Sequence, residues 1–292
     1  MARSTGGNFL RLQDKIVVVL GEGPLFNHCV KELLKKFKNI YCLTNIKNKP
    51  KYTKRINSFK IKKFKKIDFL FSIMNKRIID YQILNKTLHA INFHDAPLPK
   101  YAGLYSSTFG ILNNEKNWGC TWHIMNKKLD KGDILFQKKF KISSNNTAYD
   151  VDVQSQFYGY LLFQKIIKNL SKINKFKKKQ NDKEFTYFGK KEFNLIPNQG
   201  VIKLSHDFKK IYKIYRALKL SKEKTNLLFS PKIKIGNKIF LLKEMNILNI
   251  KGKKKEVNSL KNFKIKNKNF MIKNNGNYYQ FFLGKKFNIK KN

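Results

Sequence analysis

The chain has 292 residues, of which 41% are hydrophobic, including 25 Phe and 13 Tyr. This apolar content suffices for a packed core and argues against global disorder, and the length suits two domains better than one. Lys and Arg number 63 against 18 Asp and Glu, which gives a formal net charge of +45 and predicts attraction to polyanions such as tRNA. The excess is nearly all Lys and is spread along the chain together with abundant Asn, Ile and Phe. A genome with A/T-rich codons would produce the same composition. The lysine excess therefore has two possible explanations, codon composition and a nucleic-acid partner.

The cysteines, Cys29, Cys42 and Cys120, have neither paired nor metal-ligand spacing, which fits small buried residues in a reducing compartment. No apolar run approaches the roughly 20 residues of a membrane helix. Residues 1–12 also lack the apolar stretch of a signal peptide. We therefore expect a cytoplasmic protein that does not associate with membranes and that starts with a disordered segment, residues 1–13. Nothing in the sequence indicates an oligomeric state.

The first segments in chain order predict a doubly wound α/β sheet. Residues 15–20 form a short β-branched apolar run, which is typical of a buried parallel strand, and residues 26–37 carry apolar side chains at helical spacing. A second strand is predicted at 39–44, so the order is strand, turn, helix, strand. The Gly-x-Gly at 21–23 is weak evidence for a dinucleotide site, because the third glycine is missing and no acidic residue ends the second strand.

The following segments continue the sheet. Residues 47–66 are basic and predict a loop with a weak strand. Further strands are predicted at 67–72, 90–94, 120–125 and 134–142, with helices ending at Leu84, at 108–112 and at 147–170. We expect a Rossmann-like, mostly parallel sheet with helices on both faces, which forms a catalytic domain over residues 14–185.

The pattern changes in the last third of the chain. A short amphipathic helix is predicted at 208–218, and short apolar runs broken by Gly, Asn and Lys follow at 232–235, 239–242, 270–272 and 278–283. This pattern predicts a small β-rich, OB-like barrel domain at 206–292, joined to the first domain by a linker at 186–205.

Polar residues that could take part in catalysis gather in one region of the sequence. The relevant stretches read Asn-Phe-His-Asp-Ala-Pro-Leu-Pro-Lys-Tyr-Ala-Gly at 92–103, Gly-Cys-Thr-Trp-His at 119–123 and Leu-Asp-Lys-Gly-Asp at 129–133. Asn92 and His94 are two residues apart at the carboxyl end of a predicted strand, so their side chains share a face where ligands bind in such sheets. Asp130 follows 36 residues after His94, in a glycine turn. An amide and an imidazolium can stabilise an oxyanion, an imidazole can relay a proton near neutral pH, and a carboxylate can orient the imidazole.

Residue types alone leave two interpretations open: acyl transfer, or a structural role in which His94 only caps a strand and its turn. A covalent acyl-enzyme is not supported, because the sequence has no serine elbow and no activated cysteine motif. His94, Asp95 and His123 could bind a metal, but their spacing matches no metal-binding pattern, so we expect no metal.

The region resembles the signature of the 10-formyltetrahydrofolate-dependent formyltransferases. Their shared pattern is Asn-x-His, a Leu-Pro-x-Tyr-x-Gly-like turn, a Gly-x-[Thr/Ser]-x-His-like strand and Leu-Asp-x-Gly, and each piece occurs here in order. The resemblance implies 10-formyltetrahydrofolate as the formyl donor and Asn92, His94 and Asp130 as the catalytic triad. In the implied mechanism a neutral primary amine attacks the formyl carbon, Asn92 and protonated His94 stabilise the oxyanion, and Asp130 positions His94 and assists proton transfer.

The same resemblance implies a donor site. Lys76, Arg77, Ile78 and Ile79 match the loop that cradles the folate, mostly through backbone groups. The turn that ends at Asp133 would close over the pterin. Asp133 is also the rival to Asp130 for the catalytic role, and the spacing from His94 favours Asp130.

The acceptor is less well defined. Methionyl-tRNA formyltransferases typically carry Leu-Leu-Pro-Arg-x-Arg-Gly-Ala-Ala-Pro after the catalytic His, whereas residues 96–108 here read Ala-Pro-Leu-Pro-Lys-Tyr-Ala-Gly-Leu-Tyr-Ser-Ser-Thr. This variant favours a small amine, such as an amino sugar nucleotide or an amino acid derivative. The alternative is methionyl-tRNA, which the net charge and the basic loop at 47–66 favour. Further alternatives are a formyltetrahydrofolate deformylase and a non-catalytic basic RNA-binding module.

Overall fold

The computed structural model describes residues 12–44, 51, 53–220, 230–248, 269–274 and 277–287. Most of the predicted disordered start, and residues 47–50 and 52 of the predicted basic loop, lie outside the described residues. The chain groups into two compact units. The first comprises Met1–Ser106, Asn117–Lys141 and Val153–Tyr187, and the second comprises Ser107–Lys116, Ile142–Asp152 and Phe188–Asn292.

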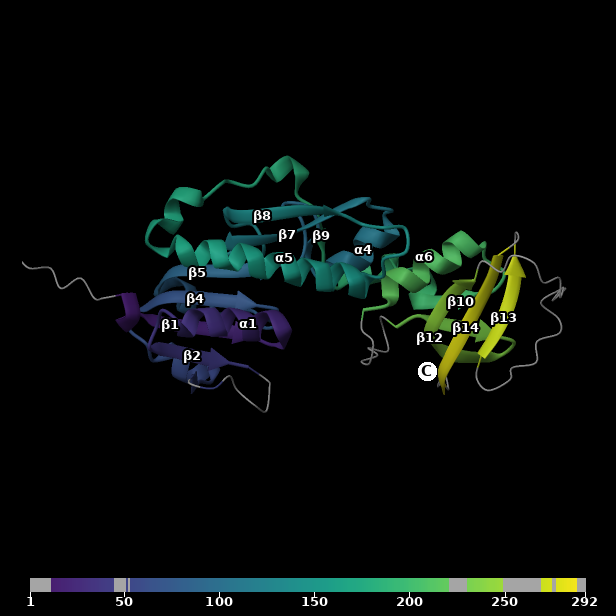
Figure 1. The fold of residues 1–292 in the computed structure, drawn as a ribbon, viewed down its shortest axis with the longest axis horizontal. Coiled ribbons are helices and arrows are strands. Elements are labelled where there is room, and N and C mark those ends of the chain that lie inside the picture. The colour runs from purple at the N-terminus through teal and green to yellow at the C-terminus, as the bar shows by residue number, and fades with distance from the viewer. Residues whose placement is uncertain are drawn as a thin grey trace, which may run out of the picture. The chain divides into compact units, whose positions relative to one another are not determined.

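The first unit contains a seven-stranded sheet of order β3-β2-β1-β4-β5-β7-β8 (Figure 1). Its strands are β1 (Ile16–Gly21), β2 (Asn39–Leu43), β3 (Lys54–Arg55), β4 (Ile67–Ile73), β5 (Thr87–His94), β7 (Asn117–Ile124) and β8 (Ile134–Lys141). The first five strands in that order pair in parallel, and β7 pairs antiparallel with both β5 and β8. The predicted mostly parallel sheet is therefore confirmed.

Helices cover both faces of this sheet and so bury the apolar side chains that its central strands carry on both sides. The helices are α1 (Gly23–Leu34), α2 (Ser58–Lys62), α3 (Tyr81–Asn85) and α5 (Ala148–Lys168), whereas α4 (Ser106–Leu112) belongs almost entirely to the second unit. Val17 and Val19 of β1 pack in one core with α1 and α5, whereas Val18 of the same strand packs in a second core with Ile61 of α2 and Ile83 of α3. This alternation of two apolar faces is what a continuous β-branched run allows.

The predicted loop at 47–66 is wrong in part, because α2 forms within it. The Asn57 side chain accepts a hydrogen bond of 2.8 Å from the backbone N–H of Lys60 and so caps the helix. A helix of five residues is shorter than two turns. It therefore shows no apolar repeat from which a helix could be predicted.

The sheet has a switch point between β1 and β4, from which the strand order runs outward in both directions. Gly21 ends β1 with φ +146°, and a Cβ atom there would lie 1.7 Å from the carbonyl oxygen of Ile73 at the end of β4. Only glycine allows the two strand ends to approach so closely. The carboxyl ends of β1, β4 and β5 thus form one edge, where ligands bind in such folds.

The second unit contains a five-stranded sheet of order β10-β11-β12-β14-β13 and the helix α6 (Phe208–Leu218). Its strands are β10 (Val201–Lys203), β11 (Lys232–Ile235), β12 (Lys238–Leu248), β13 (Asn269–Asn274) and β14 (Asn277–Phe287). All pairs are antiparallel except β10 with β11, so the predicted β-rich fold of the C-terminal part of the chain is confirmed. Closure of this sheet into a barrel stays a prediction, since residues 249–268 lie outside the described residues.

The remaining regular elements are short. β6 (Ala102–Gly103) pairs with β9 (Tyr187–Phe188), and 3-10 helices span Leu12–Asp14, Leu170–Phe176, Asp182–Glu184, Lys191–Leu195 and Pro197–Gly200. None of the helices within the described ranges is both long and apolar enough to cross a bilayer.

Candidate active site

Two neighbouring strands bring the polar side chains together. β5 pairs antiparallel with β7, and Asn92 is opposite His123 while His94 is opposite Thr121. Directly opposed residues project to the same face of a sheet, so these four side chains share one face. The intervening Phe93 is buried in the core on the opposite face. The alternation along β5 thus separates the packing residues from the residues available for chemistry.

The turn after His94 is held by hydrogen bonds from β7 and β8. The Thr121 hydroxyl donates to the Ala96 carbonyl (2.7 Å) and accepts from the Leu98 N–H (3.2 Å). The Gln137 side-chain amide donates to the Leu98 carbonyl (2.7 Å) and to the Thr121 hydroxyl (2.9 Å). Further along β7, the Trp118 indole N–H donates to the Asp95 carbonyl (2.9 Å). These bonds fix the backbone on which His94 depends.

The Asp130 carboxylate is held by an equally constrained turn. Asp130 has φ +55°, and its Oδ2 accepts a 2.9 Å hydrogen bond from the backbone N–H of Gly103. The Gln180 side-chain amide donates to the carbonyls of Asp130 and Gly132, both at 2.7 Å. A Cβ atom at Gly132 would lie 1.7 Å from the carbonyl oxygen of Ile124, so no other residue fits there without a backbone shift.

The carboxylate of Asp130 faces two imidazole rings. Its Oδ2 lies 3.9 Å from Nδ1 of His94, and its Oδ1 lies 3.5 Å from Nε2 of His123. The second nitrogen of His94, Nε2, lies 2.8 Å from the carbonyl oxygen of Tyr101. Because a carbonyl oxygen can only accept, Nε2 of His94 carries a hydrogen, and Nδ1 is the nitrogen that faces Asp130.

The charges in this group support one another. Burial lowers the pKa of His94, but Asp130, Asp95 and the Tyr101 carbonyl outweigh it, so that the pKa of His94 is raised. Burial raises the pKa of Asp130, but His94, His123 and the Gly103 N–H outweigh it and hold that pKa well below its usual range. The site therefore pairs an ionised Asp130 with a His94 that is protonated to a greater extent than an isolated histidine.

His123 completes the group, and the sequence had indicated it only as a motif residue and a possible metal ligand. Its Nδ1 lies 2.9 Å from the Ile124 carbonyl oxygen and therefore donates a hydrogen to it. Its Nε2 lies 3.1 Å from the amide nitrogen of Asn92. His123 thus connects Asn92 to Asp130. The alternation of Thr121 and His123 along a predicted strand was the available signal, but the register with Asn92 is known only from the structure.

The loop predicted to cradle the folate follows β4 at the same edge of the sheet. Ser72 of β4 is paired with Asn92, so the loop begins beside the end of β5. The Asn75 side chain donates to the Arg77 carbonyl (2.8 Å) and accepts from the Arg77 N–H (3.2 Å). Within this folded loop Ile78 is 81% exposed, whereas Ile79 packs against the second core.

Two other predicted residues lie at the border of the group. Lys76 forms an exposed ion pair of 3.3 Å with Glu22. Asp133 is half-buried and directly precedes β8, and its carbonyl accepts a 2.8 Å hydrogen bond from the Ile124 N–H. The carboxylate that faces both imidazoles is that of Asp130, so the geometry favours Asp130 over Asp133. In the described ranges, no three His, Cys, Asp or Glu side chains are grouped so that they could hold a metal ion.

Comparison with known proteins supports a family assignment. Residues 61–166 match the sequence profile of the family described as Formyl transferase. The bifunctional polymyxin resistance protein ArnA of Wigglesworthia glossinidia brevipalpis is 30% identical over 172 residues, which are 57% of this chain and 26% of that protein. The methionyl-tRNA formyltransferase of Borrelia garinii subsp. bavariensis is 37% identical over 110 residues, 36% of this chain and 34% of that protein. The chain thus spans about a quarter to a third of the length of these two relatives.

A solved structure extends the similarity over most of the chain. The N-formyltransferase of Helicobacter canadensis, crystallised with folinic acid and dTDP-3-aminofucose, superposes with a TM-score of 0.67. The match covers 93% of this chain and 100% of that chain, at 24% sequence identity. The superposition therefore shows that the two chains share a fold. The matched profile spans β4, β5 and β7 and includes Asn92, His94, His123 and Asp130. Residues 61–166 of this chain are therefore similar in sequence to the formyl transferase family, and nearly the whole chain shares the fold of an N-formyltransferase.

Proposed function

We propose that this protein transfers a formyl group from 10-formyltetrahydrofolate to a primary amine. One observation carries the proposal: a single half-buried carboxylate, Asp130, faces His94 and His123 while Asn92 contacts His123. This group lies at the carboxyl edge of a mostly parallel sheet, beside the loop that follows β4. This combination of an amide donor, a cationic donor and a fixed counter-charge suits acyl transfer, because it can stabilise a developing oxyanion.

His94 and Asn92 would stabilise the oxyanion that forms when the amine adds to the formyl carbon. The distance of 3.9 Å between His94 Nδ1 and Asp130 Oδ2 exceeds that of a hydrogen bond. A proton on Nδ1 is therefore stabilised by the charge of Asp130 and can still be donated to a substrate oxygen. The Asn92 amide nitrogen carries two hydrogens, and donation of one to His123 leaves the second for the same oxygen.

Asp130 acts in this proposal mainly through its charge. Because its pKa is held well below the usual range, it is a weak base at neutral pH. Its contribution is to keep His94 protonated and oriented and to assist proton transfer: the amine loses one proton, and N10 of the leaving tetrahydrofolate takes one up as its bond to the formyl carbon breaks. Direct attack of the amine requires no covalent acyl-enzyme, and the three cysteines are buried, so none of them offers an exposed thiol.

The residues around the loop after β4 fit a folate donor. Ile78 is 81% exposed in a loop that Asn75 holds in place. An exposed isoleucine in a fixed loop can cover an apolar ring, and burial of its side chain would contribute about 2 kcal/mol to binding. When bound, 10-formyltetrahydrofolate supplies the formyl group. Lys76, Arg77 and Ile79 belong to the same loop, and the turn from Asp130 to Asp133 would cover the pterin.

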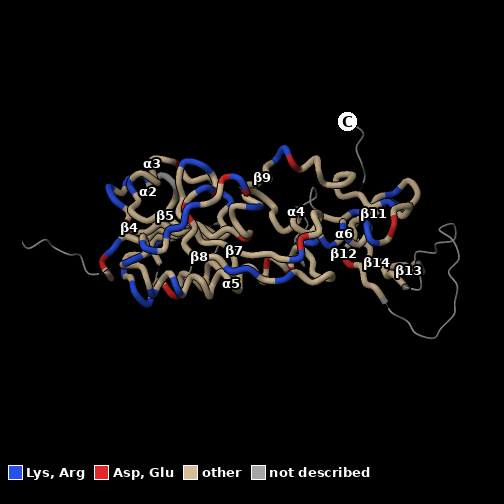
Figure 2. The backbone as a smooth tube through the Cα atoms, turned by 90° about the horizontal axis from the view of Figure 1, so that it is seen from above, with Lys and Arg blue, Asp and Glu red and all other residues tan. Residues whose placement is uncertain are grey.

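The acceptor we favour is a small amine, in particular an amino sugar nucleotide or an amino acid derivative. The turn at 96–108 lacks the arginine-containing pattern of methionyl-tRNA formyltransferases. By structure, the Helicobacter canadensis N-formyltransferase superposes over 93% of this chain with a TM-score of 0.67, and the methionyl-tRNA formyltransferase of Clostridium thermocellum over 80% with a TM-score of 0.58. Methionyl-tRNA is the second candidate because of the net charge of +45, although Figure 2 shows Lys and Arg spread over many elements.

The test is to follow tetrahydrofolate release from 10-formyltetrahydrofolate with separate acceptors: none, amino sugar nucleotides, amino acids and methionyl-tRNA. We expect release that depends on one acceptor and that is lost in His94→Ala. His28→Ala is the matched control, because His28 is an exposed histidine on α1. Release without an acceptor would instead identify a deformylase. Absence of release together with absence of folate binding would refute the proposal and leave a basic RNA-binding module as the better account.

A further inference from the structure

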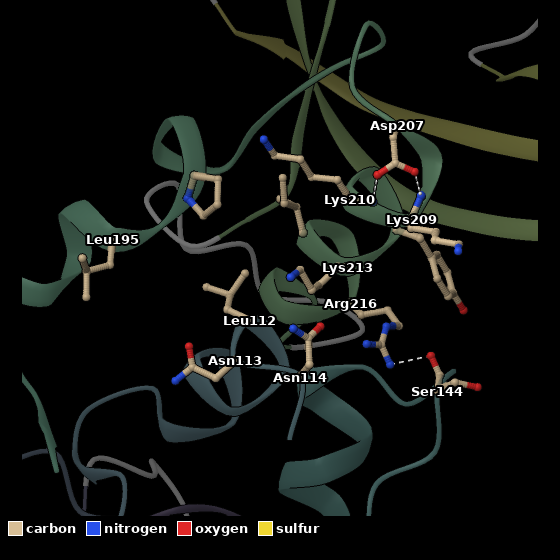
Figure 3. A pocket seen from close by; sticks show the side chains of 13 residues that line it. Leu112, Asn113, Asn114, Ser144, Leu195, Asp207, Lys209, Lys210, Lys213 and Arg216 are labelled. Atoms are coloured by element: carbon tan, nitrogen blue, oxygen red, sulfur yellow. Dashed lines mark hydrogen bonds between the residues drawn. The ribbon is translucent and has the colours of Figure 1, made fainter. Parts of the chain in front are cut away.

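The second unit contains a pocket of about 590 Å³ beside α6, none of whose residues belongs to the group around His94 (Figure 3). This volume lies within the range of roughly 300–1,000 Å³ that is common for small-molecule sites. Its lining combines residues of α6 with Leu112 at the end of α4, Ser144, and the segment from Leu195 to Pro197.

The charge of the lining is strongly positive. It contains the three lysines of α6 and one arginine, and a single carboxylate, Asp207. That carboxylate accepts hydrogen bonds from the backbone N–H groups of Lys209 (2.9 Å) and Lys210 (3.1 Å), so it caps the start of α6. The negative charge of Asp207 is therefore directed toward the start of α6, and the remaining charge of the pocket is positive.

The cations of the pocket have different roles. Arg216 donates to the carbonyl oxygens of Ser143, Ser144 and Asn146, so it is committed to holding that loop. Figure 3 shows Lys210 and Lys213 extending the other way, toward the side where Leu112 and Leu195 lie. Neither lysine forms an ion pair within the part of the chain that the structure describes. These two ammonium groups are thus available to an anionic ligand.

An apolar wall faces the two lysines. Leu195 is 60% exposed although it lines the pocket, and Pro197 and Leu112 lie in the same lining. A simple inorganic anion gains nothing from such a wall, whereas a ligand with a planar or apolar part covers it. The lining thus combines two recognition elements, a pair of ammonium groups and an exposed apolar side chain.

We propose that this pocket binds a phosphate-bearing nucleotide unit. Its phosphates lie against Lys210 and Lys213, and its base or sugar covers Leu195. Such phosphates can come from a free nucleoside diphosphate or from an RNA chain, and both offer the same chemistry to the lysines. The proposal does not depend on formyl transfer, because binding is measured in the absence of folate and of an amine acceptor.

The experiment titrates the full-length chain with thymidine diphosphate, inorganic pyrophosphate and a short single-stranded RNA. The test variant is Lys210→Gln with Lys213→Gln. The matched control is Lys36→Gln with Lys165→Gln, which removes the same charge from two exposed positions, one just after α1 and one on α5. We expect the test variant to bind the diphosphate or the RNA at least about tenfold more weakly than the control, because each lysine contributes a charge-assisted contact.

The three ligands distinguish the sources of the phosphate. For RNA, the test variant should also reduce the slope of log K against log salt by about 1.4, since each single-strand phosphate contact contributes about 0.7. Leu195→Ala should weaken the binding of thymidine diphosphate several-fold and leave the affinity for pyrophosphate unchanged. In the wild-type chain, the bound ligand should protect Lys210 and Lys213 from acetylation, which requires no variant. The proposal would be overturned by equal affinities of the test and control variants, or by Lys210 and Lys213 side chains that are acetylated equally with and without ligand. It would also be overturned if none of the three ligands bound to the wild-type chain.

Discussion

The substitution Asp130→Asn tests the electrostatic argument most directly, because it removes one charge and almost no volume. The side-chain carbonyl of the introduced asparagine could still accept the hydrogen bond that Gly103 now donates to Oδ2. The expected loss concerns the stabilisation of the imidazolium of His94, whose Nδ1 is 3.9 Å from that oxygen. At an effective dielectric constant of about 20, two unit charges at this distance attract each other by about 4 kcal/mol, which is an upper bound.

Loss of half of that interaction, about 2 kcal/mol, would lower kcat/KM roughly 30-fold, since about 1.4 kcal/mol corresponds to a factor of ten. The pH profile gives the second measurement. In the wild type, activity that needs protonated His94 falls as the pH rises through the raised pKa of His94. In the variant the largest cause of the upward shift is gone, so the fall in activity should occur at lower pH.

The assay is acceptor-dependent release of tetrahydrofolate, measured from pH 5 to 9 with saturating donor. Asp182→Asn is the matched control. Asp182 forms an exposed ion pair with Lys131, the residue that follows Asp130, so this variant also removes one carboxylate charge close to the site. Exposed pairs of this kind contribute at most about 1 kcal/mol, and the control should keep the wild-type profile. A variant at Asp130 with kcat/KM within about threefold of the wild type and an unshifted profile would refute the reasoning.

Three further predictions concern the support of the site. Gly132→Ala should destabilise the fold by about 2 kcal/mol or more and reduce activity, because its Cβ would meet the Ile124 carbonyl; thermal unfolding and the release assay measure both. Thr121→Val should cost about 1–3 kcal/mol in denaturant unfolding, since the Ala96 carbonyl loses its donor in the core. The lowered pKa of Asp130 contributes stability that is present above the unfolded pKa of about 3.9 and is lost as the pH falls toward the folded pKa. The free energy of unfolding of Asp130→Asn should therefore differ from that of the wild type at pH 7 and converge toward it on acidification.

Most strands of the first unit could be predicted because burial on both faces leaves an unambiguous apolar run. The predicted strand at 67–72 corresponds to β4, all seven residues of which are buried. β5 starts three residues before the predicted 90–94, since its first residues are partly exposed and mix polar with apolar types. The helix α2 was missed because a single turn buries too few side chains to produce a periodic pattern.

The site was predicted less completely than the fold, and the reason is the register of an antiparallel pair. Asn92 and His94 were found because they are neighbours on one strand, and this proximity follows from local geometry. His123 meets Asn92 only because β7 pairs with β5 in one particular register, and a shift by one residue would turn His123 into the core. Sequence spacing also favoured Asp130 over Asp133, but it carried no information on which imidazole nitrogen would face the carboxylate.

The presence of His123 changes what a loss of activity at Asp130 means. If the carboxylate served His94 alone, Asn92 would be independent of it, and substitutions at Asn92 and Asp130 would add. In the structure His123 contacts both, with Nε2 3.1 Å from the Asn92 amide and 3.5 Å from the carboxylate. Residues that share a partner show coupling energies of about 0.5–3 kcal/mol in double-mutant cycles. Because His123 donates through Nδ1 to a backbone carbonyl, its Nε2 can accept the hydrogen of the Asn92 amide, and this ring is held between Asn92 and Asp130. We therefore expect the double variant Asn92→Ala with Asp130→Asn to lose less activity than the sum of the two single losses, whereas strictly additive losses would show that His123 does not couple the two residues.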